Sequence, residues 1–273
     1  MQYDWLSAHI FYQGRAEELL CRVVQPFISQ ILPLLHVQSP WFYIRYVAGG
    51  PHIRLRLHAN NNYLVQLKEQ LEHATTNVAY VPYEREIKRY GNQTTIALAE
   101  EQFFSSSACS LQFISATPYW NTQTALGIAW QMHIAFFHAL DSDVFTIRTI
   151  CGAFIASWIP VLTNNHDAAF QQITDHMHML YNRQAISLQT CAAALWQSLD
   201  TRQAPAPLQA YADRSRSLLQ QYREAGLDDE QLRYAIRSLL HMTHNRLGIS
   251  NREEAWCIFI TDRCIKYIYE HAY

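Results

Sequence analysis

Three cationic side chains alternate along one short stretch of the sequence. The stretch from Trp41 to His58 reads WFYIRYVAGGPHIRLRLH, and His52, Arg54 and Arg56 follow its Gly-Gly-Pro turn at every second position. On a β-strand this spacing puts the three side chains on one face of the sheet and an apolar set on the other. We call the three residues the cationic shelf. Arginine is permanently charged and rarely buried without a partner, so the shelf predicts a facing anion, either a structural carboxylate or a ligand.

A second charged cluster, YEREIKRYG, runs from Tyr83 to Gly91. Glu86 and Arg89 are three residues apart, so a helical turn would make them neighbours. A charge-dense run after a strand is usually a solvated connection. The tyrosines on both sides indicate instead that this segment packs against something, which would hold its charged groups in defined positions.

The third cluster, LLHMTHNRLG, lies near the C-terminal end at Leu239 to Gly248. On a helix, His241 and Asn245 are one turn apart and share a face, whereas His244 lies on another face. Histidine is the side chain best suited to proton transfer near neutral pH. A histidine on a half-apolar helix is nevertheless more often a hydrogen-bonded core residue, so both interpretations stay open at this point.

The sequence contains no motif typical of hydrolases, nucleotide-binding proteins or metal sites. The sequence contains no GxSxG, GxxxxGK[ST] or GxGxxG pattern, which leaves hydrolase and nucleotide-binding functions without support. The histidine pairs His176/His178 and His133/His138 lack the spacing of a helical zinc site. Cys257 and Cys264 share one face of the last helix, as buried packing residues do. We therefore expect neither a metal nor a cofactor.

Composition narrows the class of protein. The chain has 273 residues, of which 49% are hydrophobic, and a formal net charge of −2, so no global basic field would attract nucleic acid. Its six cysteines form no CxxC pair, and the N-terminal segment lacks the pattern of a signal peptide. The longest apolar stretches are interrupted by polar residues and are short for membrane spans. These features predict a cytoplasmic protein with reduced thiols.

The first ninety residues alternate between strand and helix patterns in the order βαββαβ, which is the order of ferredoxin-like domains. Strands are predicted at Trp5 to Tyr12, Trp41 to Ala48, His52 to His58 and Val78 to Tyr83, and helices at Arg15 to Leu35 and Tyr63 to His73.

From about residue 95 onwards the apolar period is helical. Helices are predicted at Thr94 to Phe104, Asn121 to Leu140, Asp143 to Leu162, Ala168 to Asn182, Leu188 to Leu199, Leu208 to Ala225, Asp228 to Asn245 and Arg252 to Ala272. The hydroxyl-rich patch Ser105 to Ser110 predicts a loop. The expected fold class is α+β: a single domain, 1–273, with a ferredoxin-like βαββαβ sheet portion in 1–92 and a mostly α-helical portion in 93–273.

Taken together and in this order, the three clusters resemble the C-terminal domain of lantibiotic dehydratases, also called the thiopeptide-type bacteriocin biosynthesis domain. The resemblance covers essentially the whole chain, from the first strand to the last helix. In that family an N-terminal domain uses glutamyl-tRNA to glutamylate Ser and Thr of a precursor peptide. The C-terminal domain then eliminates glutamate to leave dehydroalanine or dehydrobutyrine.

The resemblance implies site residues by their match to the family motifs. The elimination residues fall on Arg54, Arg56, Glu86, Arg89 and His241, with His244 as the less favoured histidine. Residues beside them are candidates for substrate binding, namely His52, Tyr83, Arg85, His244, Asn245 and Arg246. The family uses no metal or cofactor in this step, so none is implied.

Two departures from the family shape the expectation. The glutamylation domain is missing, which implies a standalone subunit of a split dehydratase whose partners are the precursor peptide and a separate tRNA-dependent glutamylating subunit. Asn92 stands where the family commonly has a second glycine, which puts the placement of Arg89 in question. The precursor could add as a strand to a sheet edge. The apolar helices between Tyr119 and Leu162 would suit a homodimer interface.

Two other functions remain open. Standalone relatives on the same fold include pyridine synthases, which join two dehydroalanines by a formal [4+2] cyclisation in thiopeptides or pyritides. These relatives usually lose the elimination motifs, whereas the arginines and the histidine are retained here. The other alternative is a catalytically inactive scaffold that binds the precursor peptide within a modification complex.

Overall fold

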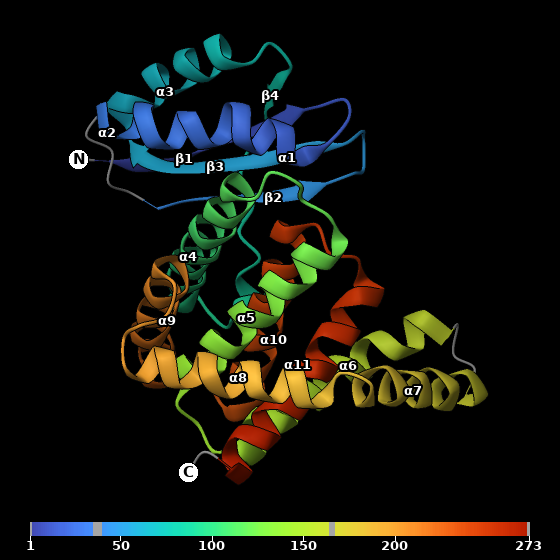
Figure 1. The fold of residues 1–273 in the computed structure, drawn as a ribbon. Coiled ribbons are helices and arrows are strands. Elements are labelled where there is room, and N and C mark those ends of the chain that lie inside the picture. The colour runs from blue at the N-terminus through green and yellow to red at the C-terminus, as the bar shows by residue number, and fades with distance from the viewer. Residues whose placement is uncertain (1, 35–39, 164–166, 272–273) are drawn as a thin grey trace.

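The computed structural model describes residues 2–34, 40–163 and 167–271. It is an α+β arrangement in which a small sheet, with the first helix and α3 (Asn61–Ala74) on one of its faces, stands at one end and a larger group of helices at the other (Figure 1). The predicted helix ends at Leu35 and Ala272 lie outside the described residues. The division into domains is tested by no finding and stays a prediction.

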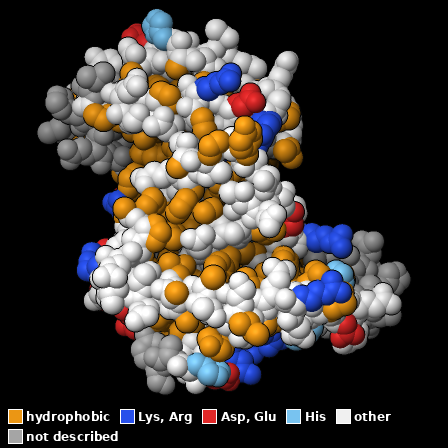
Figure 2. All heavy atoms as spheres, in the orientation of Figure 1, with side chains coloured by type: hydrophobic (Ala, Val, Ile, Leu, Met, Phe, Trp, Pro, Cys, Tyr) orange, Lys and Arg blue, Asp and Glu red, His pale blue; other side chains and the backbone are white. Residues whose placement is uncertain are grey.

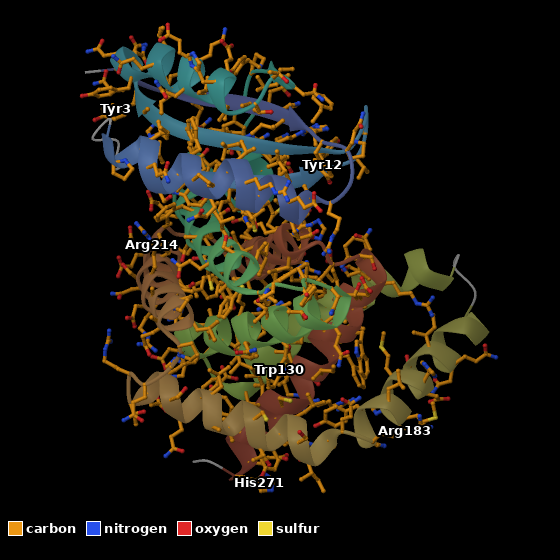
Figure 3. All side chains as sticks on the ribbon, turned by 45° about the horizontal axis from the view of Figure 1, so that its top comes forward. Tyr3, Tyr12, Trp130, Arg183, Arg214 and His271 are labelled. Carbon is orange, nitrogen blue, oxygen red and sulfur yellow. The ribbon has the colours of Figure 1, made fainter. Side chains whose placement is uncertain are left out.

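The sheet has four antiparallel strands in the order β2-β3-β1-β4. Their bounds are β1 Tyr3–Phe11, β2 Trp41–Tyr46, β3 His52–Asn60 and β4 Val78–Tyr80. Tyr3 and Tyr12, labelled in Figure 3, mark the two ends of β1. The order of strands and helices agrees with the βαββαβ prediction, while the likeness to ferredoxin-like domains stays a prediction.

The two faces of β3 differ as the alternation predicts. Ile53, Leu55 and Leu57 are almost completely buried. Helices cover this apolar face. Arg45 shows which face it is, since its register partner is Ile53 and it pairs with Glu17 of the first helix at 2.6 Å. Arg54 and Arg56 lie on the opposite face, since strand side chains alternate.

The first helix, from Ala16 to Leu34, is irregular. It consists of α1 (Ala16–Leu19), π-helical stretches at Leu20–Val24 and Phe27–Ile31, and α2 (Leu32–Leu34). Pro26 explains the widened turns, because it has no N–H to donate and its ring collides with the carbonyl one turn earlier. The second helix of the sheet unit is α3 (Asn61–Ala74), capped by the side chain of Asn60.

The remaining helices follow the predicted order with small shifts at most ends, but α4 extends to Ala116 and not only to the predicted Phe104. They are α4 (Thr95–Ala116), α5 (Thr122–Leu140), α6 (Val144–Thr163), α7 (Asp167–Asn182), α8 (Ala185–Asp200), α9 (Ala206–Glu224), α10 (Asp229–Leu247) and α11 (Asn251–His271). Asp228 and Gln231 form a reciprocal capping box at the start of α10, and Gly248 ends it in the left-handed conformation. None of the helices that the structure describes is long and apolar enough to cross a membrane.

The loop predicted at Ser105 to Ser110 is wrong, because α4 continues through it. These serines are buried rather than exposed, and their small size lets α4 pack closely. Ser107 Oγ accepts hydrogen bonds from the backbone N–H of Tyr43, at 3.2 Å, and from Arg246 Nε, at 2.7 Å. The patch therefore joins α4 to both β2 and α10.

Helix α10 is fixed to the edge strand β2. The side-chain oxygen of Asn245 accepts from the N–H of Arg45, at 2.9 Å, and its NH₂ donates to the carbonyl of Arg45, at 3.0 Å. This pairing satisfies an open strand edge as a neighbouring strand would. It also holds the His241 turn of α10 beside the sheet.

The apolar helices between Tyr119 and Leu162 contribute mainly to the core. Met132, Phe136 and Phe137 are completely buried, whereas Tyr119 and Phe145 are exposed. Figure 2 shows hydrophobic side chains gathered over the helical part below the sheet unit. A homodimer interface on these helices stays a prediction.

Candidate functional site

The three sequence clusters meet at one pocket of about 240 Å³. It lies between the shelf face of the sheet, the segment after β4, and α10. All five residues matched to the elimination motifs line it, with others from the same elements: Phe42, Ile44, Arg45, Tyr46, Arg54, Arg56, Tyr83, Glu84, Glu86, Arg89, Tyr90, Phe103, His241, Met242 and Asn245. A larger hollow of about 630 Å³ between α7 and α11 contains none of the predicted site residues.

Arg54 is held by its neighbours on the shelf. Its guanidinium carbon lies 3.4 Å from the centre of the Tyr46 ring. Its Nε donates to His52 Nε2 at 3.3 Å, while His52 Nδ1 donates to the carbonyl of Gly50 at 2.7 Å. His52 is buried and does not line the pocket. It therefore orients Arg54 rather than presenting a surface to a ligand.

Arg56 is stacked but not paired. Its guanidinium carbon lies 4.1 Å from the centre of the Tyr83 ring, and its buried Nε has no hydrogen-bond partner. Burial lowers the pKa of Arg56 below its ordinary value. Among the described residues, neither Arg54 nor Arg56 takes part in an ion pair. Of the two anions that the sequence left open, the pocket thus favours a ligand over a structural carboxylate.

The cationic shelf also acts on His9 of β1, the register partner of Arg54. Burial, followed by the charges of Arg54, His52 and Arg56, lowers the pKa of His9 to about 4. Between this pKa and that of an unfolded histidine, near 6.5, protons bind the unfolded chain more tightly than the folded one. His9 therefore favours the folded state above this range, and that contribution is lost as the pH falls through it.

We expect the His9→Gln variant to resist mild acid better than the wild type. On lowering the pH from 7.5 to 5, the wild type should lose about 1–2 kcal/mol more of its free energy of unfolding than the variant. Urea unfolding of both proteins at the two pH values measures the difference. Equal losses would show that His9 is readily protonated in the folded protein.

The segment after β4 orders its charged residues through a short 3₁₀ helix, Ile87–Tyr90. Arg89 Nη1 lies 3.1 Å from Glu86 Oε2, and Arg89 Nε donates to Ser238 Oγ of α10 at 3.3 Å. The predicted Glu86 and Arg89 neighbours are therefore in contact. Asn92, the departure from the family pattern, accepts the N–H groups of Thr94 and Thr95 at the start of α4, and Arg89 still lines the pocket.

Gly91 is the residue that the turn after Arg89 requires. Its φ is +107°, and an added Cβ would lie 2.5 Å from Thr95 Oγ1 and 2.9 Å from Leu227 Cδ1. Gly91→Ala should lower the free energy of unfolding by about 1–3 kcal/mol, because it adds backbone strain and a clash. Urea unfolding tests this against Gly127→Ala in α5, where a Cβ meets nothing within 4 Å. Equal stability of Gly91→Ala and wild type would contradict the assignment.

Arg85 faces away from the pocket. It forms two hydrogen bonds to the buried Glu100 of α4, from Nε at 2.7 Å and from Nη2 at 2.8 Å. Burial raises the pKa of Glu100, with the hydrogen bonds from Arg85 and Tyr83 acting against this rise. The pair fixes the base of the segment and the ring of Tyr83, which lies under Arg56.

His241 is paired with a residue that the sequence patterns did not reveal. Its Nδ1 lies 2.9 and 3.0 Å from the two carboxylate oxygens of Glu254 on α11. Burial acts to raise the pKa of Glu254, but hydrogen bonds from His241 and His244 outweigh it and lower the pKa. Because the carboxylate accepts from Nδ1–H, the other ring nitrogen, Nε2, is left as the basic atom of His241.

Sequence reasoning missed Glu254 because the only local signal there is the cap of α11. Ser250 and Glu253 form a capping contact, with Ser250 N donating to Glu253 Oε2 at 2.9 Å. Glu254 is the next residue and is 1% exposed. Nothing in its spacing points to His241, which is thirteen residues earlier on another helix.

The other predicted binding residues of α10 are His244, Asn245 and Arg246, and only one of them lines the pocket. His244 is completely buried and does not line the pocket. Asn245 lines the pocket and is also hydrogen-bonded to the backbone of Arg45 on β2. Arg246 is also completely buried, where it donates to Ser107 and to the carbonyl of Met242, and burial lowers its pKa to about 10. Of the two candidate histidines, only His241 reaches the pocket.

Comparison with known families agrees with the resemblance seen in the sequence. The family described as lantibiotic biosynthesis dehydratase, C-terminal, matches residues 5–265. The subtilin biosynthesis protein SpaB of Bacillus subtilis is 32% identical over an alignment of 114 residues, and the match covers 38% of this chain and 11% of SpaB. The chain therefore spans only about a tenth of that relative's length.

Solved structures share the fold. The tRNA-dependent lantibiotic dehydratase MibB from Microbispora sp. 107891 has a TM-score of 0.64 and 19% identity, over 98% of this chain and 28% of MibB. TsrL has a TM-score of 0.71 and 15% identity, covering 98% and 96% of the two chains. The pyridine synthase TbtD from thiomuracin biosynthesis has a TM-score of 0.69 and 12% identity, covering 98% of both. At these identities the likeness is one of fold alone.

Proposed function

Because this chain belongs to the family of lantibiotic biosynthesis dehydratase C-terminal domains, we propose that it eliminates glutamate from glutamylated Ser and Thr of a ribosomally made precursor peptide. The observation that carries the proposal is the meeting of Arg54, Arg56, Arg89 and His241 at one pocket. Family membership supports peptide modification in general, and the pocket chemistry supports this particular reaction.

The reaction needs a base, and His241 has the required environment. Its Nε2 takes the α-proton of the glutamylated residue, and the Cα–H electron pair becomes the second bond between Cα and Cβ. The Cβ–O bond breaks, and its electrons leave with the glutamate carboxylate. Glu254 is a positioning residue that holds Nδ1–H and stabilises the imidazolium formed by proton transfer.

The reaction also develops negative charge, for which the arginines are suited. Removing the α-proton builds charge on the neighbouring amide oxygen, and the departing glutamate is an anion. Arg54 and Arg56 have no ion-pair partner among the described residues and are already oriented by Tyr46 and Tyr83. Guanidinium groups bind carboxylates and oxyanions through paired charge-assisted hydrogen bonds. Glu86 orients Arg89, because a carboxylate beside arginine is a poor base.

This chemistry defines the partners. The substrate is a precursor peptide already carrying glutamyl esters, so a glutamylating activity must act first. MibB is described as a tRNA-dependent dehydratase, and we propose that a tRNA-dependent glutamylating protein supplies the substrate here. The leader part of the precursor would bind outside the pocket, which has room for one side chain and its ester.

A second candidate function is pyridine formation. The chain covers nearly all of TbtD, a pyridine synthase, but little more than a quarter of MibB. In such a cyclase the same pocket would hold two dehydroalanines. The cluster of unpaired arginines favours elimination, because cyclisation of two neutral alkenes expels no carboxylate.

Two substrates distinguish the candidates. The purified protein is incubated with a synthetic glutamylated Ser peptide and, separately, with a leader peptide bearing two dehydroalanines, and the products are weighed by mass spectrometry. Conversion of the first to dehydroalanine supports elimination, whereas loss of water and leader from the second identifies a cyclase. Inertness toward both would favour a peptide-binding scaffold.

A further inference from the structure

Three side chains of types that bind metals meet in the interior of the helical part, one from each of three helices. They are His133 of α5, His244 of α10 and Cys257 of α11, and their ligand atoms all lie within 4.8 Å of one another. The two histidines are completely buried and Cys257 is 1% exposed. Trp130, labelled in Figure 3, lies about one turn before His133 on α5.

The histidines in this cluster have free ring nitrogens. His133 Nε2 and His244 Nε2 are buried without a hydrogen-bond partner. The other nitrogen of His133, Nδ1, lies 3.3 Å from Thr261 Oγ1. Glu254 Oε2 lies 3.5 Å from His244 Nδ1, but its short contacts are with His241. Buried polar atoms in proteins are nearly always bonded, and a bound ion is one recognised reason for an exception. Two such nitrogens beside a buried thiol therefore point to a shared ligand.

The separations suit a tetrahedral ion. Cys257 Sγ lies 3.7 Å from His133 Nδ1. A nitrogen and a sulfur bound to the same tetrahedral zinc are about 3.6 Å apart, from bond lengths of about 2.0 and 2.3 Å. The rings of His133 and His244 are edge-to-face with centroids 4.6 Å apart.

We propose that His133, His244 and Cys257 bind one zinc ion, which ties α5, α10 and α11 together. Imidazole and thiolate ligands select zinc over magnesium or calcium.

The proposed role of the ion is structural, because none of its three ligands lines the pocket. The Cys257 thiolate and the nearby Glu254 carboxylate together balance the two charges of the ion. Because all three ligands are buried, the ion enters as the chain folds rather than through a channel. Bound zinc holds α10 and α11 in the arrangement that brings His241 to Glu254.

Elemental analysis of the purified chain tests the site. Protein produced with zinc in the medium should contain about one zinc ion per chain, and Cys257→Ser should lose it. Cys264→Ser is the matched control, because Cys264 is also a buried thiol of α11 and is outside the cluster. Equal zinc in wild type and Cys257→Ser would overturn the proposal, as would a wild type that contains none.

Refolding gives a test that needs no variant. Wild-type protein is unfolded in urea that contains a chelator and is then refolded with or without zinc. The midpoint temperature of unfolding is measured after free metal is removed. The midpoint should be higher for the zinc sample. Refolding with cobalt should add a thiolate-to-cobalt absorption band. Equal midpoints and no band would show that the cluster binds no such metal.

Discussion

Replacing His241 with Gln is expected to lower the rate of glutamate elimination by about 10²–10⁴-fold, the usual contribution of a positioned general base. Glutamine can still donate to Glu254, so the buried carboxylate keeps a partner, but an amide cannot accept the α-proton. The measurement is glutamate released from a glutamylated Ser peptide in a single turnover. Because the change removes chemistry rather than binding, peptide affinity should be preserved.

A matched histidine variant controls for this experiment. His73→Gln changes an exposed histidine at the end of α3 that does not line the pocket. It should eliminate glutamate at the wild-type rate. Wild-type activity in His241→Gln would remove this residue from the mechanism, since no other histidine lines the pocket among the described residues.

Replacing Arg56 with Gln is expected to lower elimination by about 10²–10³-fold, as does loss of a single donor to a developing oxyanion. Arg56 has a buried Nε without a partner and stacks on Tyr83, so its guanidinium is held in place before substrate binds. Arg56→Lys should recover only part of the rate, because an ammonium group supplies the charge without the planar fork. Rates measured with saturating glutamylated peptide isolate this effect from weaker binding.

The arginine experiment also has a control on the surface. Arg22 is exposed in the first helix, on the covered side of the sheet, and Arg22→Gln should leave the rate unchanged. If Arg56→Gln eliminated glutamate as fast as Arg22→Gln, Arg56 of the cationic shelf would not stabilise the reaction. Arg54→Gln should act more on peptide binding, since Arg54 is the arginine whose Nε is already engaged by His52.

Local patterns predicted most of the elements and one face of the site. The alternation of HIRLRL was enough to assign its two faces, because strand geometry leaves a side chain only two directions. Helical periodicity similarly located the later helices to within a few residues at most ends. Ser105 to Ser110 failed because polarity and small size predict opposite environments, and here close packing of α4 against β2 and α10 decided the outcome.

The contacts between elements could not be predicted from spacing. Glu254 reaches His241 only because the short connection after α10 brings the first turn of α11 beside the end of α10. His133 and Cys257 meet although they lie 124 residues apart in the sequence. Arg85 and Arg246 are charged residues in site motifs, yet one is paired with Glu100 and the other is enclosed by Ser107 and Met242. The order of the motifs in the sequence indicated the family. Only the burial of each side chain in the structure distinguishes positioning residues from residues that face the pocket.

The ratio of dehydroalanine to released glutamate tests the central claim most directly. The wild-type protein is mixed with a peptide carrying one glutamylated Ser, and both products are counted over time. Elimination in this pocket predicts one dehydroalanine for each glutamate, and neither product should form with His241→Gln at a comparable rate. Release of glutamate with the Ser hydroxyl restored would mean ester hydrolysis, and that result, or no release by the folded protein, would contradict the account.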